Sequence, residues 1–198
     1  MDIYCDSTIP PVSPKHPWFV VAQNPEDDGQ VHIFYNIRDR MSHYCCQIPE
    51  LLGMRIQGCF HACWEVLSSN HPRDVIWSLW NPITSNIINL PPLNHSEGGD
   101  CDDMRDCCLS APPEDPNSVL LLMRTAKPSF VYYRLGIYPS FKDTIWTELT
   151  YANQIKMITD CDVGSLHCLS CCNGKVFAYI RGLTGNRRRT LIIVEVNI

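Results

Sequence analysis

The sequence lacks the short catalytic motifs that identify a reaction. It contains no G-x-S-x-G nucleophile turn, no H-E-x-x-H zinc-protease helix and no phosphate-binding P-loop. Each motif fixes a nucleophile, a metal or a phosphate-binding backbone in one local geometry, so its absence excludes the enzyme classes built on it. We therefore expect a protein that is not an enzyme, and we assign no catalytic, cofactor-binding or metal-binding residue.

Long apolar runs and a basic N-terminal leader are also missing. The apolar runs are short, such as those at residues 119–123 and 191–194, and fall far short of the roughly 18 residues that cross a bilayer. The first six residues, 1–6, have neither a basic region nor the apolar core of a secretory signal. The sequence predicts no membrane contact and a cytoplasmic or nuclear location.

Positive charge is scarce: 16 Lys and Arg stand against 21 Asp and Glu, which gives a net charge of -5. Proteins that bind nucleic acid usually carry a basic face, so nucleic acid is not an expected partner. We expect the only basic run, residues 187–189, to be a solvated loop tip, with an acidic partner or RNA as the alternative. We expect the polar stretch at residues 94–105 to be a surface loop, and its acidic part, which reaches Asp106, could attract a basic substrate.

Cysteine, by contrast, is plentiful, with 12 residues in a chain of 198. Without a signal peptide we interpret them as reduced thiols rather than as a disulfide framework. Some are adjacent, and neighbours in a strand point to opposite faces, so one member of each pair can fill a core. The pairs are Cys45–Cys46, Cys107–Cys108 and Cys171–Cys172.

A zinc site is the main chemical alternative. Zinc prefers four Cys or His ligands in a tetrahedral array, often supplied by C-x-x-C knuckles. Cys168 and Cys171 form one knuckle, and a looser set consists of Cys59, His61 and Cys63. Paired knuckles at a recognised spacing are absent, and strand alternation predicts that Cys168 and Cys171 lie in a core. We therefore favour packing over zinc.

A cysteine nucleophile would need a histidine or a helix N-terminus to lower the pKa of its thiol. His167 precedes Cys168, and His61 lies near Cys59 and Cys63 in the sequence. Because adjacent residues of a strand face opposite ways, we expect His167 and Cys168 not to meet.

Short apolar and aromatic runs between turn residues predict an all-β protein. Residues 1–17 form an extended, proline-rich lead-in, and only residues 151–158 could make about two helical turns. Asn-Gly at residues 173–174 is a strong hairpin signal. The predicted strands are residues 18–22, 31–36, 44–49, 54–60, 64–67, 75–80, 86–90, 107–110, 118–123, 130–135, 144–149, 165–170, 175–180 and 190–196.

The strands follow a repeated pattern. Phe-Tyr-Asn at residues 34–36 precedes Ile-Pro at 48–49, and Leu-Trp-Asn at 79–81 precedes Leu-Pro at 90–91. Residues 54–93 hold four strands within about 40 residues, the period of a propeller blade. We predict an incomplete β-propeller of about four four-stranded antiparallel blades within residues 18–198, with the Trp residues packed in the blades. The blades are approximately 18–49, 54–93, 107–150 and 165–198, and the packing residues are Trp64, Trp77, Trp80 and Trp146.

Several short motifs occur in one order along almost the whole of this region. They are Phe-Tyr-Asn at 34–36, Gly-Cys-Phe-His at 58–61 followed by Trp64, Leu-Trp-Asn-Pro at 79–82 with Leu-Pro-Pro at 90–92, Asp-Pro-Asn-Ser-Val-Leu at 115–120, Trp-Thr-Glu at 146–148 and Cys-Asn-Gly-Lys-Val at 172–176. In this order they resemble the plant KIB-type β-propeller family, an F-box-associated, kelch-like family long labelled a domain of unknown function.

The resemblance implies a propeller that presents a protein substrate and is usually fused to an N-terminal F-box. The F-box docks a Skp1-type adaptor of a cullin-RING ubiquitin ligase. Some members are implicated in brassinosteroid signalling through capture of a glycogen-synthase-kinase-3-like kinase, so a kinase is one partner that the resemblance suggests.

The sequence departs from this pattern in three places. Residues 1–17 are too few for an F-box of about 40–50 residues, so we do not expect direct recruitment of the adaptor. The last blade lacks a fourth strand before Ile198, and Cys63 stands where the family commonly has Gly. We expect a non-catalytic protein-recognition module. The alternatives are a zinc-binding or redox-responsive protein, a truncated non-functional paralogue, a partial gene model, or a partner for another chain.

Overall fold

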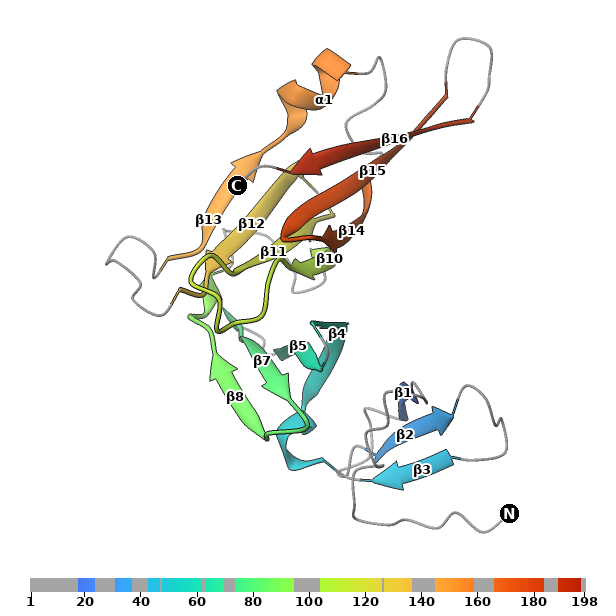
Figure 1. Cartoon of the computed structure of the whole chain (residues 1–198), viewed down its shortest axis with the longest axis vertical. Coiled ribbons are helices and arrows are strands. Elements are labelled where there is room, and N and C mark those ends of the chain that lie inside the picture. Colours follow the sequence, from blue (N-terminus) through green and yellow to red (C-terminus); the bar gives the residue numbers. More distant parts are fainter. Residues whose placement is uncertain are drawn as a thin grey trace. The chain divides into compact units, whose positions relative to one another are not determined.

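The computed structural model in Figure 1 divides into two compact units, Met1–Ile56 and Gln57–Ile198, and each is described by itself. All strand pairs with a defined register are antiparallel. The structure describes residues 18–23, 31–36, 43–46, 48–61, 63–69, 74–94, 104–125, 127–136, 145–158, 166–183 and 189–196.

The first unit contains a three-stranded sheet in the order β1-β2-β3. Its strands are β1 (Trp18–Gln23), β2 (Val31–Asn36) and β3 (His43–Cys46). All three were predicted, but β3 ends before the predicted Pro49. A short 3-10 helix, Pro49–Leu51, begins there because proline fits the first helical position, where its missing N–H costs no hydrogen bond.

A four-stranded sheet follows in chain order. It consists of β4 (Met54–Phe60), β5 (Trp64–Ser69), β7 (Trp77–Asn81) and β8 (Asn86–Asn89). The predicted strand at residues 75–80 is interrupted at Ile76, whose carbonyl accepts a hydrogen bond from the Ser69 N–H at 2.9 Å. The break leaves a separate two-stranded ribbon, which the sequence did not indicate. It pairs β6 (Asp74–Val75) with β9 (Leu93–Asn94).

The next sheet also has four strands in chain order, and one helix follows it. The strands are β10 (Met104–Leu109), β11 (Val119–Arg124), β12 (Ser129–Arg134) and β13 (Thr147–Thr150), and the helix is α1 (Ala152–Ile158). The helix was predicted. The prediction of a loop over residues 94–105 is wrong at both ends, because Asn94 belongs to β9 and Arg105 to β10.

The last sheet has three strands in the order β14-β15-β16. They are β14 (Leu166–Cys172), β15 (Lys175–Leu183) and β16 (Arg189–Val196). The predicted Asn-Gly hairpin is confirmed: φ is 52° at Asn173 and 73° at Gly174, the two positive values that a tight primed turn requires.

The sheet β10–β13 is apolar on both faces, and two hydrophobic cores use it. Leu120 and Leu122 of β11 belong to a core shared with the sheet β4–β8. Leu121 and Met123 face the opposite way, into a core shared with β14, β15 and α1. A strand that is buried on both faces has a continuous rather than an alternating apolar sequence, which explains the run at residues 119–123.

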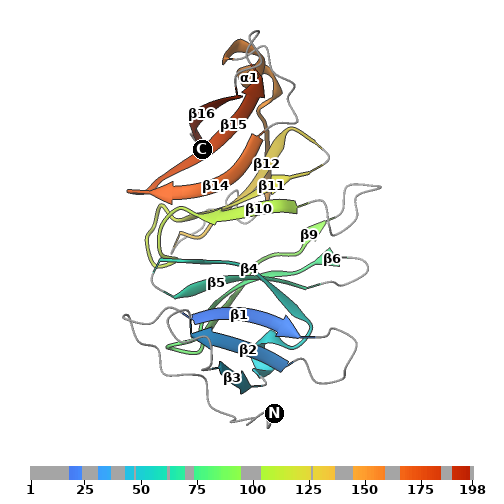
Figure 2. The ribbon, with the colours of Figure 1, turned by 90° about the vertical axis from the view of Figure 1, so that its right-hand side faces the viewer.

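The predicted all-β fold class is confirmed. Apart from the two-stranded ribbon of β6 and β9, the described sheets have three, four, four and three strands in chain order, as expected for an incomplete β-propeller. Within the second unit the first strands of successive sheets, β4, β10 and β14, lie along one side (Figure 2). No helix among the described residues is long and apolar enough to cross a membrane.

Candidate functional site

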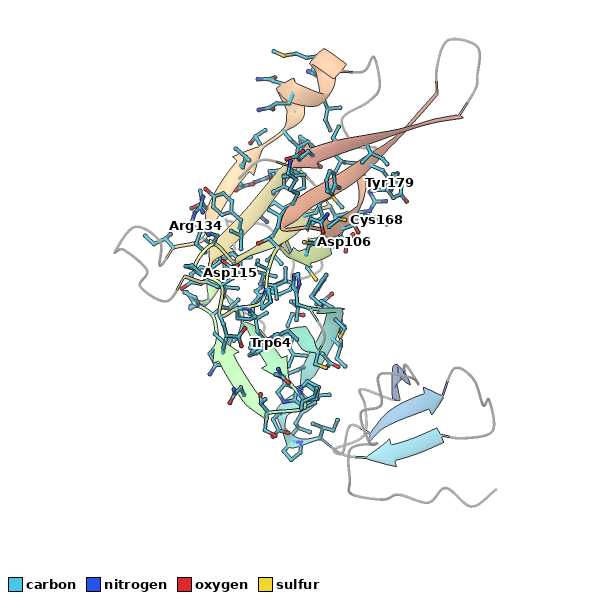
Figure 3. All side chains as sticks on the ribbon, in the orientation of Figure 1. Trp64, Asp106, Asp115, Arg134, Cys168 and Tyr179 are labelled. Atoms are coloured by element: carbon cyan, nitrogen blue, oxygen red, sulfur yellow. The ribbon has the colours of Figure 1, made fainter. Side chains whose placement is uncertain are left out.

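Polar side chains gather where β10 meets β14, at the junction of two successive sheets. Arg105 and Asp106 extend from β10, His167 and Cys168 from β14, and Tyr179 from β15. We term these five residues the seam cluster, and Figure 3 shows three of them, Asp106, Cys168 and Tyr179, close together. Arg105 and Cys168 are exposed and the other three are half-buried, so the cluster is open to a partner.

A β-bulge at Cys168 shapes this cluster. The register of β14 against β15 shifts between His167, which lies opposite Tyr179, and Leu169. Cys168 is the extra residue, with a left-handed φ of 43°. The prediction that Cys168 lies in a core is therefore wrong, because the bulge interrupts strand alternation and leaves the thiol exposed.

Both bulge residues contact the same tyrosine. The His167 ring stacks on the Tyr179 ring with centroids 5.6 Å apart, and the Cys168 thiol donates to the Tyr179 hydroxyl at 3.7 Å. The seam cluster thus places an imidazole, a thiol and a phenol beside one another on an accessible surface.

Hydrogen bonds from β10 hold the bulge in place. Arg105 Nη2 donates to His167 Nδ1 at 2.7 Å, and Arg105 Nη1 donates to the Leu166 carbonyl at 3.4 Å. A guanidinium can only donate, so His167 Nδ1 accepts and the ring proton lies on Nε2. The Asp106 carboxylate accepts from the Leu169 N–H at 2.7 Å and from the Cys107 N–H at 2.9 Å. Two charged side chains therefore fix the backbone on both sides of Cys168.

The cysteine and histidine residues considered for zinc make separate contacts. His61 Nε2 donates to the Leu109 carbonyl at 2.7 Å, and the Cys171 thiol donates to the Ser110 carbonyl at 2.9 Å. Cys59 is exposed on β4. Within the part of the chain that the structure describes, no three Cys, His, Asp or Glu side chains are placed to hold a metal ion.

Glu65 is a buried carboxyl group that the sequence did not single out. It lies on β5 directly opposite Trp80 of β7, and both side chains are nearly inaccessible. Glu65 Oε2 and Trp80 Nε1 have no hydrogen-bond partner. Burial raises the pKa of Glu65 to about 7, and desolvation together with the charge of Glu65 raises the pKa of Cys59 to about 11.

The predicted packing tryptophans lie inside the protein. Trp64, Trp77 and Trp80 are buried, as predicted. Trp146 is half-buried against the first core, where its ring lies 5.4 Å from the Tyr133 ring. Its indole N–H donates to the Pro91 carbonyl at 2.8 Å, so the Trp-Thr-Glu and Leu-Pro-Pro motifs join two successive sheets.

The remaining motifs build turns and close packing. The Asp115 carboxylate accepts from the Asn117 N–H at 2.8 Å, an Asx turn that carries the chain from β10 to β11. A Cβ on Gly58 would lie 2.8 Å from the Phe60 ring, so only glycine fits there without a shift of the ring. These motifs therefore have structural roles, and a binding surface has to be sought among the exposed side chains.

Two charged stretches that the sequence singled out lie largely outside the described residues. Residues 187–188 of the basic run and residues 97–103 of the acidic stretch are not described. Asp106, the end of the acidic stretch, lies on β10 and accepts a hydrogen bond from the Leu169 N–H of β14 rather than being solvated in a loop.

The sheets are antiparallel, follow one another along the chain and pack face to face on shared cores. This arrangement defines a β-propeller protein. A sequence model of the KIB1-4 beta-propeller family matches residues 34–186. The chain belongs to this family, and the resemblance derived from its motifs is confirmed. No curated protein and no solved structure matches the chain.

Proposed function

We propose that this chain is a non-catalytic protein-recognition module and that the seam cluster is part of its contact surface. Membership of a propeller family supports an interaction role, since propellers present variable side chains on a rigid scaffold. The observation that carries the proposal is the pair of bonds from Arg105 to His167 and Leu166. They hold exposed polar groups in a fixed arrangement, and a surface organised before binding loses less entropy on binding.

The proposed role corresponds to the substrate-binding propeller of plant F-box proteins in ubiquitin ligases. The partner is a protein substrate, and a kinase is the candidate that the family resemblance suggests. The proposed location is cytoplasmic or nuclear. These finer statements depend on the likeness to the family rather than on a particular contact in the seam cluster.

A charge-reversal experiment tests the recognition surface. The full chain, its Arg105→Glu variant and its Lys156→Glu variant are immobilised, and proteins retained from plant extract are quantified by mass spectrometry. Lys156 is an exposed residue on α1, so its reversal makes the same change in net charge away from the seam. We expect a specific protein to be retained by the wild type and by Lys156→Glu and to be lost with Arg105→Glu.

Equal retention by all three proteins would contradict the assignment of the surface. Circular dichroism of each variant checks that Arg105→Glu remains folded, since this residue also bonds to β14. The retained set also tests the finer proposal. A kinase without the adaptor would support substrate recognition, and purified adaptor that binds the chain directly would contradict it.

A further inference from the structure

Two cysteines from different sheets meet beneath the seam cluster. Cys108 of β10 is fully buried, and half-buried Cys171 of β14 packs against the core that contains it. The two thiols are close enough for Cys171 to contribute to raising the pKa of Cys108. Their other contacts are also neighbours: Cys108 Sγ lies 3.9 Å from the Leu109 carbonyl oxygen, and Cys171 Sγ lies 2.9 Å from that of Ser110.

Strand alternation selects this pair from four candidates. Cys107 and Cys108 are adjacent on β10, but Cys107 belongs to the core on the opposite face of the sheet. Cys171 and Cys172 are adjacent on β14, and Cys172 is exposed. Only Cys108 and Cys171 share a core, which excludes the alternative pairings across this seam.

We propose that Cys108 and Cys171 are an oxidisable thiol pair that closes to a disulfide between the sheets β10–β13 and β14–β16. Cys108 and Cys171 lie on strands β10 and β14, which contact each other, and they share one core, so the bond would join two strands that already pack together. The bond is a modification of the seam and does not depend on the proposed recognition function.

The oxidant is a peroxide, and Cys171 reacts first because Cys108 is inaccessible to solvent. The Cys171 thiolate attacks one peroxide oxygen, a sulfur–oxygen bond forms, the oxygen–oxygen bond breaks, and the released hydroxide takes up a proton to become water. The Cys108 sulfur then attacks the sulfenic acid at Cys171. The disulfide bond forms, the sulfur–oxygen bond breaks, and the hydroxyl leaves with the Cys108 proton as water. In sum, two thiols and one hydrogen peroxide give one disulfide and two waters.

Burial sets the speed of this reaction. Desolvation raises the pKa of Cys108 to about 12 and also raises the pKa of Cys171, whereas the Gly174 backbone opposes the rise at Cys171. The thiolate is the reacting form, so we expect slow oxidation that speeds up as pH rises.

Peptide mapping of the full chain tests the pair. Protein treated with hydrogen peroxide or with dithiothreitol is alkylated with N-ethylmaleimide, digested with trypsin without reduction and analysed by mass spectrometry. We expect peroxide to produce a cross-link between tryptic peptides 106–124 and 157–175, which contain Cys108 and Cys171. Dithiothreitol should remove the link.

Variants assign the link to the two sulfurs. Cys171→Ser should lose it, whereas the neighbouring Cys172→Ser and Cys107→Ser should keep it. Cys108→Ala should also lose the link. If this change in the core prevents folding, Cys171→Ser still tests the proposal, because Cys171 is only half-buried. The proposal is overturned if the link persists in Cys171→Ser, if it joins other cysteines, or if oxidised wild type shows only unlinked, oxidised cysteines.

The urea midpoint provides an independent readout. A disulfide between residues 108 and 171 closes a long loop and restricts the unfolded chain. Peroxide should therefore raise the midpoint for wild type and Cys172→Ser and leave it unchanged for Cys171→Ser. Equal shifts of the urea midpoint in all three proteins would show that the disulfide does not cause the shift and would overturn the proposal.

Discussion

Cys63 has a backbone conformation that suits glycine. Its φ is 145°, and it directly precedes Trp64, at the position where the family commonly has Gly. The departure from the family was visible in the sequence, but the strain it causes depends on a dihedral angle that no pattern of side chains reveals. Cys168 presents the same difficulty. Cys168 is the extra residue of a bulge in β14 and has a left-handed φ of 43°. The prediction from strand alternation that it lies in a core therefore failed.

Replacing Cys63 with glycine should stabilise the protein. Cys63→Gly removes the Cβ that makes this φ costly, and strain of this kind is worth about 1–3 kcal/mol. Glycine adds about 0.5–1 kcal/mol of entropy cost, so we expect a net gain of about 1 kcal/mol in the free energy of unfolding by urea. Cys63→Ser is the control because it keeps a Cβ. An equal gain from serine would show that loss of the thiol, rather than relief of strain, is responsible.

The buried carboxyl of Glu65 should make stability fall as pH rises. Its pKa is about 7 in the folded protein and 4.5 as the ordinary value, so the folded state holds the proton more tightly. The contribution that protonated Glu65 makes to the free energy of unfolding is complete below pH 4.5 and is lost as pH rises through 7. Each pKa unit corresponds to about 1.4 kcal/mol, so the loss between pH 5 and 8 is on the order of 2–3 kcal/mol.

Glu65→Gln tests this pH dependence, because glutamine has a similar shape and cannot ionise. Urea unfolding between pH 5 and 8 should show a smaller decline in stability for this variant than for wild type. Glu114→Gln, which changes an exposed carboxyl, should keep the wild-type decline. A decline of equal size in Glu65→Gln would assign the pH dependence to other groups.

Strands and turns were the most predictable features of this chain. The Asn-Gly dipeptide predicted its hairpin because the primed turn needs two residues with positive φ. The ribbon of β6 and β9 was not predicted because two-residue strands carry no periodicity. The start of β10 was missed for a different reason. Arg105 and Asp106 resemble loop residues in sequence, yet they bond to the neighbouring strand β14.

Gly174→Ala should weaken the last sheet. A Cβ at Gly174 meets no atom within 4 Å, so the penalty comes from its φ of 73° alone. A left-handed conformation costs an ordinary residue about 1–2 kcal/mol, and we expect this loss in the free energy of unfolding by urea. The matched control is Asn173→Gly at the preceding turn position, which should change stability by a few tenths of a kcal/mol. A neutral Gly174→Ala would show that the turn relaxes to another type.

At the scale of the whole molecule, the sequence predicted blades but not how their faces combine. The resemblance and the repeat indicated stacked sheets, whereas the meeting of Cys108 with Cys171 depends on which face each strand turns to its neighbour. Only three-dimensional packing shows this, because the two residues lie in different sheets. The same limit applied to the seam cluster, whose members come from three strands.

The two cores of the second unit should unfold as one, because the sheet β10–β13 belongs to both. Leu121 lies in the core shared with β14 and β15, whereas Trp64 and Trp77 lie in the other core. Leu121→Ala leaves a cavity and should cost about 2–5 kcal/mol. If the cores are coupled, tryptophan fluorescence should report this loss at the same urea midpoint as far-UV circular dichroism.

Ile145→Ala, at a side chain that is 64% exposed, is the control and should shift neither probe appreciably. Separate transitions by the two probes would show that the cores fold independently. A broad, non-cooperative transition in wild type would instead favour the alternative of a non-functional remnant, since a well-packed domain unfolds cooperatively. Coincident, cooperative transitions would establish that the sheets carrying the seam cluster form one folding unit. Recognition by a rigid surface at their junction requires that coupling.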